Sequence, residues 1–481
     1  MATGVPGLDA VVGGGFVEGH TYLVVGKAGT GKTLMSLQWL REGLRQQDRS
    51  LYVTLAETWP EIESNASTLA WSLDGIAHAD LSPSGQEMPE EYSVFSASEV
   101  EKTPMWKEIV KRIEEFRPQR LVLDSLTHLR YLSVDLHQFR RQLIGLVNYL
   151  NARSCTTLML FEPDELVHET SAALAVNGVI RLRSEISPGA ATGLRSVQVE
   201  KMRGSDFIAG AHPVRLGRAG HTVYPHLIEQ VDPHCVAGPC LPTGVAGLDE
   251  LLAGGIESGT TTLLSGPAGA GKTTLGTHFL VHHSQALRGA IFTFEESAAL
   301  LASRARNTGA PIDKALASGA LHIHRVNPLE LYPDEFLARV RHAVEVDHCK
   351  VVMIDSLRGY AIAMEEFGSA QAHVHNLVAY LTRKGVTTVL VSEVENIAGS
   401  NLVAADMGVS HLADNIILMR YAEDAGRVIK VVGCLKKRAS GFEPELRELR
   451  ISASGLQVGA KLRHLRGILT GVPTNLLPAA A

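Results

Sequence analysis

Residues 3–33 read TGVPGLDAVVGGGFVEGHTYLVVGKAGTGKT, and residues 243–273 read TGVAGLDELLAGGIESGTTTLLSGPAGAGKT. The two stretches align without a gap over their whole length, at a constant offset of 240 residues. Each has a short apolar run, then a glycine-rich loop ending in Gly-Lys-Thr, then a segment with helical spacing. A loop of this kind between a strand and a helix lets backbone N–H groups surround a phosphate. The sequence therefore predicts two homologous domains that each bind a nucleoside triphosphate.

The similarity between the two halves continues beyond these loops. RLVLDSLTHL at 120–129 corresponds to KVVMIDSLRG at 350–359, and TTLMLFE at 156–162 corresponds to TTVLVSE at 387–393. Between the halves, IEQVDPHCVAGPCLP at 228–242 accumulates Pro and Gly and loses periodicity, as linkers do. The pattern indicates a duplicated domain. We expect an N-terminal domain over 1–230, a C-terminal domain over 243–463 and a tail over 464–481.

Within each half, short runs rich in Val, Ile, Leu and Thr alternate with segments of helical spacing. Continuous apolar runs suit strands that are buried on both faces of a parallel sheet. The expected fold is therefore α/β, with a mainly parallel sheet between helices and ligands at the carboxyl ends of the strands. The strands expected in the first half are Thr21–Val25, Leu51–Leu55, Leu121–Asp124, Thr157–Phe161, Val179–Leu182 and Val197–Lys201.

Composition excludes several classes of protein. The chain has 481 residues, a formal net charge of −6 and five cysteines. A scattered, odd number of cysteines does not suggest a disulfide framework, and the balanced charge announces no nucleic-acid partner. The N-terminus does not resemble a signal peptide, and no run reaches the length of a membrane span. We expect a cytoplasmic protein without a membrane anchor.

Both glycine-rich loops match G-x-x-x-x-G-K-[ST], in which the lysine reaches the outer phosphates and the hydroxyl that follows binds Mg²⁺. An Asp at the end of a later apolar strand, Asp124 and Asp355 here, suits the Mg²⁺ shell. We therefore predict ATP and Mg²⁺ as cofactors, with Thr33, Asp124, Thr273 and Asp355 at the metal. The predicted phosphate-binding residues are Gly26, Gly29, Thr30, Gly31, Lys32 and Thr33, and Gly266, Gly269, Ala270, Gly271, Lys272, Thr273 and Thr274.

Hydrolysis needs a carboxylate that orients and deprotonates the attacking water. Glu295 and Glu296 stand at the end of the strand that follows the second P-loop helix. The first half has Ala56-Glu57 at the matching place, so one acid is replaced by alanine. Two further pairs of cations close the two halves, Lys201/Arg203 and Lys436/Arg438. In an assembly they could face the phosphates of a neighbouring subunit, as an arginine finger does.

These residues resemble the KaiC family within the RecA-type ATPases. The resemblance covers nearly the whole chain: the TG-x-x-GLD-x-x-x-GG lead-in, both phosphate loops, the paired acids, the D-S-L stretches, the K-x-R segments and ILTGVPT at 468–474. It implies two tandem RecA-like domains and a two-tiered hexameric ring with ATP between adjacent subunits. It further implies a slow ATPase that acts as a regulatory switch through a protein partner, and it leaves serine/threonine autokinase activity open.

The chain departs from the family at several positions. Clock members carry adjacent Ser and Thr phosphoacceptors, whereas Ser410 is followed here by His411, so a full two-site phosphorylation cycle is not expected. Ala56 weakens the case for turnover in the first half. Thr308 stands where the family has a Trp near the adenine.

Two other functions share the same core. A RecA-type DNA motor would need basic, glycine-rich loops, but ENIAGSNLVAADMGV at 395–409 has two acids and no Lys or Arg. A nucleotide-stabilised scaffold would bind ATP without useful turnover. Nucleic acid is therefore a less favoured partner than a second copy of the chain and a regulatory protein.

Overall fold

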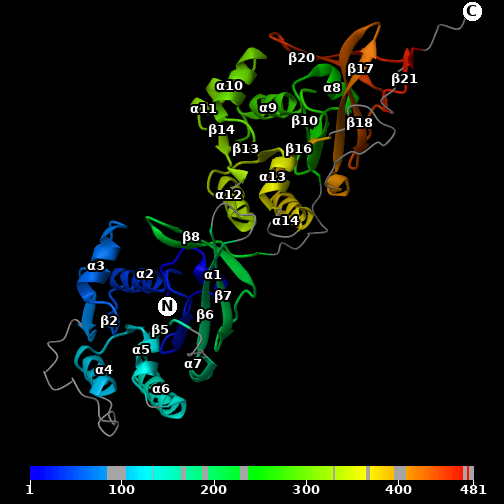
Figure 1. Cartoon of the computed structure of the whole chain (residues 1–481). Helices are drawn as coiled ribbons and strands as arrows, with labels where there is room; N and C mark the ends of the chain where they lie inside the picture. The colour runs from blue at the N-terminus through cyan, green and yellow to red at the C-terminus, as the bar shows by residue number, and fades with distance from the viewer. Residues whose placement is uncertain are drawn as a thin grey trace, which may run out of the picture. The chain divides into compact units, whose positions relative to one another are not determined.

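The computed structural model divides the chain into two compact units, Met1–Leu227 and Ile228–Ala481. The structure describes residues 1–83, 104–133, 135–163, 170–186, 193–227, 237–328, 331–364, 369–394, 408–469 and 474–475. Each unit contains one nine-stranded sheet flanked by helices (Figure 1). This confirms the predicted pair of α/β domains with mainly parallel sheets.

In the first unit the sheet order is β3-β2-β4-β5-β1-β6-β7-β8-β9. The strands from β3 to β6 run parallel, and β7, β8 and β9 add antiparallel pairings at one edge. The elements are α1 (Leu8–Val11), β1 (Thr21–Val25), α2 (Lys32–Arg45), β2 (Ser50–Thr54), α3 (Trp59–Ser67), β3 (Ala77–Asp80), α4 (Pro104–Phe116), β4 (Arg120–Asp124), α5 (Leu126–Tyr131), α6 (Leu136–Asn151), β5 (Thr156–Phe161), α7 (Thr170–Ala175), β6 (Gly178–Ile186), β7 (Gly193–Met202), β8 (Ala211–Gly217) and β9 (Gly220–Val223).

The second unit repeats this order as β14-β13-β15-β16-β12-β17-β18-β19-β20. Figure 1 shows β17 and β18 on the opposite side of this unit from α10 and α11. The elements are β10 (Cys240–Leu241), α8 (Ala246–Leu251), β11 (Ile256–Glu257), β12 (Thr261–Gly266), α9 (Lys272–His283), β13 (Gly289–Thr293), α10 (Ala298–Asn307), α11 (Ile312–Ala317), β14 (Leu321–Arg325), α12 (Pro333–Glu345), β15 (Val351–Asp355), α13 (Leu357–Met364), α14 (Ala370–Arg383), β16 (Thr387–Glu393), η4 (Val409–His411), β17 (Asn415–Asp424), β18 (Arg427–Lys437), β19 (Arg447–Ser452), β20 (Gly455–Lys461), β21 (Leu465–Arg466) and β22 (Thr474–Asn475).

Two apolar layers cover the two faces of each sheet, because successive side chains along a strand point to opposite faces. In the first unit Tyr22 and Val24 of β1 pack with α2 and α3, whereas Leu23 and Val25 pack with α4, α5 and α6. The second unit has the same two layers. Burial on both faces explains why the central strands read as unbroken apolar runs.

The first residues of the predicted tail pack against the second unit. Leu465 and Ile468 are buried against Ala422 and Val431, which lie on β17 and β18. Of the predicted linker over 228–242, residues 228–236 lie outside the described residues.

Candidate functional site

The two phosphate-binding loops lie where β1 meets α2 and where β12 meets α9. Gly31 and Gly271 form the helix N-caps with φ of 95° and 110°, a left-handed conformation that favours glycine. In this geometry the first N–H groups of each helix have no partner within the helix, so they are available to an anion. The predicted phosphate-binding residues lie in these two loops, at the end of β12 and in the first turns of α2 and α9.

The P-loop lysines are buried over their own loops. The ammonium of Lys32 donates to the carbonyl oxygens of Gly26 at 2.8 Å and Lys27 at 3.1 Å, and it lies 3.3 Å from a carboxylate oxygen of Glu162. Lys272 donates in the same way to two loop carbonyls, Gly266 and Pro267, at 2.7 Å each. Each lysine is thus held at the place where the outer phosphates of a triphosphate would bind.

The predicted Mg²⁺ ligands meet in both halves. The hydroxyl of Thr33 donates to Asp124 at 3.0 Å, and Thr273 bonds Asp355. Burial raises the pKa of both aspartates, and that of Asp355 rises to about 6, with the charges of Glu295 and Glu296 adding to the shift. A hydroxyl and a carboxylate are hard oxygen donors of the kind that Mg²⁺ prefers, so the residues fit this ion.

Tyr52 contacts the first of these aspartates, and sequence reasoning missed it. Its hydroxyl donates to Asp124 at 2.5 Å from the neighbouring strand β2, and the matching residue on β13 is Ile291. A buried tyrosine beside a polar strand end was the only available signal. Asp124 therefore has a buried tyrosine as a hydrogen-bond donor, which Ile291 cannot provide to Asp355.

The predicted catalytic acids lie beside these aspartates. The backbone N–H of Phe294 donates to the carbonyl of Asp355 at 2.8 Å, which places the Glu295-Glu296 turn next to the strand end of β15. In the first half the N–H of Leu55 makes the same bond to Asp124 at 2.6 Å. Burial and the charge of Asp124 raise the pKa of Glu57. The structure thus brings together the P-loop, the aspartate and at least one acid in each half.

A second pair of acids, Glu162 and Glu393, was not predicted. Glu162 directly follows β5 and Glu393 is the last residue of β16, and these are the strands next to the P-loop strands. Glu162 contacts the P-loop lysine, and the charge of Glu393 acts on Lys272, the pKa of which is lowered by burial. Their signal was present in the repeated TTLMLFE and TTVLVSE segments, each of which ends in glutamate.

Each predicted cation pair divides into two different environments. The ammonium of Lys201 donates to the carbonyls of Ala173 and Val176, and Lys436 donates to those of Ser410 and Ala413. These lysines are therefore engaged inside their own halves, and burial lowers their pKa values.

The two arginines lie after the strands that carry these lysines. Arg203 is exposed, and its guanidinium has no partner among the residues that the structure describes. Arg438 donates to Asp414 and to the carbonyl of His411. The arginines, rather than the lysines, are thus the cations exposed at the surface.

A further pair of cations touches the P-loops at equivalent positions. Arg195 on β7 donates to the carbonyl of Gly29 at 3.1 Å, and Lys430 on β18 donates to that of Gly269 at 2.7 Å. These contacts tie the antiparallel edge of each sheet to its phosphate loop. Sequence reasoning missed them because they depend on the fold of the β6–β7 and β17–β18 hairpins.

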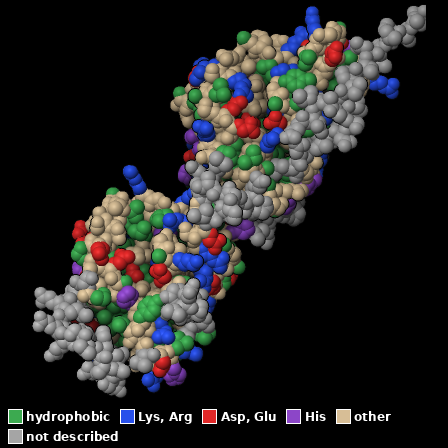
Figure 2. Space-filling view, in the orientation of Figure 1, with side chains coloured by type: hydrophobic (Ala, Val, Ile, Leu, Met, Phe, Trp, Pro, Cys, Tyr) green, Lys and Arg blue, Asp and Glu red, His purple; other side chains and the backbone are tan. Residues whose placement is uncertain are grey.

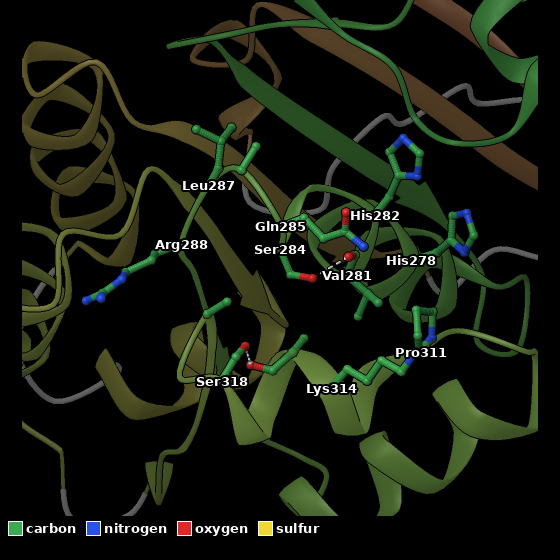
Figure 3. A pocket seen from close by; sticks show the side chains of 13 residues that line it. His278, Val281, His282, Ser284, Gln285, Leu287, Arg288, Pro311, Lys314 and Ser318 are labelled. Atoms are coloured by element: carbon green, nitrogen blue, oxygen red, sulfur yellow. Dashed lines mark hydrogen bonds between the residues drawn. The ribbon is translucent and has the colours of Figure 1, made fainter.

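A hollow of about 740 Å³ lies at the far end of α9 from the P-loop (Figure 3). Its lining includes His278 and His282 of α9, Lys314 of α11 and Arg288, and none of its thirteen lining residues is acidic. Lys272 at the start of α9 is not among them. This hollow is therefore separate from the candidate nucleotide site.

His221 of β9 packs against the first P-loop. An added Cβ at Gly31 would come within 2.6 Å of its Nε2, and its side chain is 1% exposed. Burial lowers its pKa to about 4. The folded state therefore disfavours protonation of His221, and its neutral form is fully compatible with the fold above the ordinary pKa near 6.5.

Acidification below pH 6.5 is expected to destabilise the first half through His221, by about 3 kcal/mol at pH 4, because the unfolded chain takes up a proton that the folded chain resists. His221→Leu copies Leu456, its counterpart on β20, and should remove this part of the pH dependence. All four tryptophans lie in the first half, so urea unfolding followed by tryptophan fluorescence at pH 7 and pH 4.5 measures it. An unchanged pH dependence in the variant would contradict the prediction.

The remaining features noted in the sequence add little to the candidate nucleotide site. Ser410 lies in η4 and is partly buried, and His411 is exposed. Residues 395–407 of the stretch weighed for DNA binding lie outside the described residues.

Within the described ranges no cluster of three or more His, Cys, Asp or Glu side chains could hold a metal, and no helix is long and apolar enough to cross a membrane. Figure 2 shows acidic and basic side chains interspersed over the visible face of both halves.

Comparison with known proteins identifies the family of the chain. A family model described as ATPase: KaiC matches residues 1–228 and 241–463. The circadian clock oscillator protein KaiC of Parathermosynechococcus lividus is 26% identical over 486 residues, which cover 98% of this chain and 88% of the relative. KaiC of Synechococcus elongatus is 26% identical over 490 residues, covering 99% and 92%, and KaiC of Prochlorococcus marinus strain MIT 9313 is 25% identical over 491 residues, covering 99% and 96%. The chain therefore belongs to the KaiC family of ATPases, with one family domain in each half.

Proposed function

We propose that the protein binds Mg-ATP in both halves, assembles into a ring and hydrolyses ATP slowly as a regulatory switch. The observation that carries this proposal is the double occurrence of one constellation: a buried P-loop lysine, a Thr–Asp pair and an acid at the end of the next strand. Mg²⁺ bound at the Thr–Asp pair would neutralise charge on the outer phosphates. The same machinery in two halves suits a protein in which one nucleotide state influences another.

The chain's own residues have distinct tasks in this mechanism. Lys272 and the N–H groups at the start of α9 bind the phosphates and orient the terminal one. Glu295 lies close enough to Asp355 to affect its pKa, and it can take a proton from a water aligned for attack. In the first half Glu57 is the acid of this turn, and burial and the charge of Asp124 raise its pKa. We infer faster turnover in the second half.

The proposed ring rests on Arg203 and Arg438. Each is exposed just after an antiparallel strand, β7 or β18, where a guanidinium can reach the nucleotide of an adjacent copy. Size-exclusion chromatography with light scattering should show a higher oligomer with Mg-ATP than without it. Arg203→Ala with Arg438→Ala should weaken the assembly. A monomer under saturating Mg-ATP would remove the ring from the proposal.

Signalling by this switch would pass to a regulatory protein that reads the nucleotide state, as expected of a relative of clock oscillator proteins. The proposal also includes autokinase activity at Ser410. Incubation with γ-labelled ATP tests both activities: released phosphate reports the ATPase, and label retained on the chain and lost in Ser410→Ala reports the kinase. Salt-dependent DNA affinity with faster hydrolysis would favour a DNA motor instead.

A further inference from the structure

The two adjacent acids of the second half have different partners. Glu295 accepts a hydrogen bond from the hydroxyl of Ser356, 2.6 Å away, next to the aspartate of the proposed Mg²⁺ site. Glu296 forms an ion pair with Arg304, which lies about two turns along α10. The backbone of Glu296 is also held, because Thr293 donates to its carbonyl and accepts from its N–H. Glu296 is therefore fixed at both backbone and side chain.

Arg304 also stands next to the proposed nucleotide site. It lines a small hollow together with Thr273 of the P-loop and Thr308 at the end of α10. The second carboxylate oxygen of Glu296, Oε2, is buried and has no hydrogen-bond partner in the described part of the chain. The guanidinium is thus the group that neutralises this carboxylate, within a short distance of where Mg-ATP would bind.

The first half has a counterpart of Glu296, which is Glu57, but no counterpart of Arg304. Counting from the matching residues Thr58 and Ser297, Asn65 stands in the place of Arg304, Glu57 in that of Glu296 and Ala56 in that of Glu295. In this turn and the helix after it, the second half thus has one carboxylate, Glu295, and one guanidinium, Arg304, more than the first. An acid added without the arginine would repel a triphosphate, which carries several negative charges itself.

We propose that Arg304 is a positioning residue of the second ATP site, which holds Glu296 in place and offsets its charge, so that Glu295 is the acid left to activate water. This inference rests on the proposed function of the site. It assigns Glu296 an electrostatic partner rather than a second catalytic task.

The test compares affinities in the full chain with Lys32→Ala, which removes nucleotide binding from the first half. Arg304→Gln should weaken Mg-ATP binding, measured by calorimetry, about fivefold to tenfold, because an uncompensated carboxylate then faces the triphosphate. Arg304→Gln with Glu296→Gln should restore the affinity, and Arg304→Lys should retain most of it. Rescue by the second substitution separates charge compensation from a merely structural role.

Two outcomes would overturn the inference: an unchanged affinity in Arg304→Gln, or a double variant as weak as the single one. Arg306→Gln is the matched control, because Arg306 pairs with Asp313 on the exposed surface, and it should leave the affinity unchanged. Phosphate release is measured on the same samples. If the chain binds ATP with this pattern but never hydrolyses it, the proposed ATPase fails while the role of Arg304 stands.

Discussion

Replacing Glu295 with glutamine is expected to slow phosphate release from the second half by about 100- to 1000-fold, while ATP remains bound. Glutamine keeps the shape of the side chain and can still contact Ser356, but it cannot accept the proton of the attacking water. Loss of a general base typically has an effect of this size. The measurement is steady-state phosphate release in a chain that also has Glu57→Gln, so that the first half contributes little.

Glu296→Gln is the matched control, because it removes an adjacent carboxylate that is already paired with Arg304. We expect this variant to slow hydrolysis by less than about tenfold, since Glu296 is not the residue proposed to activate water. If the chain with both Glu57→Gln and Glu295→Gln hydrolysed ATP within about twofold of the rate of the chain with Glu57→Gln alone, Glu295 would not be the base.

Arg120→Val is expected to destabilise the first half by about 3–5 kcal/mol. Arg120 is fully buried, lies over the ring of Trp39, and donates to Asp48 and to the carbonyls of Ala2 and Trp39. The second half has Val351 at this position, so valine fits the strand but leaves these acceptors without their donor. Urea unfolding followed by tryptophan fluorescence measures the change in the free energy of unfolding.

Arg45→Val provides the comparison for this stability test. Arg45 pairs with Glu42 on the same helix end, but its side chain is 75% exposed, and exposed pairs contribute about 0–1 kcal/mol. We expect Arg45→Val to shift the unfolding midpoint little. Similar losses in both variants would contradict the assignment of a structural role to the buried contacts of Arg120.

The sequence predicted the central strands well because burial on both faces leaves a strong apolar signal. Thr21–Val25 matches β1 residue for residue. The edge strand Ala77–Asp80, AHAD, was missed, since Ala and Asp are poor strand formers and this edge is only partly buried. β8 contains Pro213 and ends in Gly217, which also hide a strand at the antiparallel edge.

The candidate site was predictable where one local segment supplies the chemistry. The P-loops, Asp124 and Asp355 fall into that class, because a phosphate loop and a strand-end aspartate are read from short stretches. Tyr52 and Arg304 were not predictable, since each acts on a residue that the fold brings near. The K-x-R segments lie between these cases: the repeat identified them, but only the contacts of Lys201 show that the lysine is engaged inside its own half.

The central claim is that two P-loops each bind one nucleotide, and native mass spectrometry in the presence of Mg-ATP counts them directly. The account predicts two ATP molecules per chain, one after Lys32→Ala, and none after Lys32→Ala with Lys272→Ala. A well-folded wild-type chain that binds no nucleotide, or a double variant that binds as many as the wild type, would contradict it.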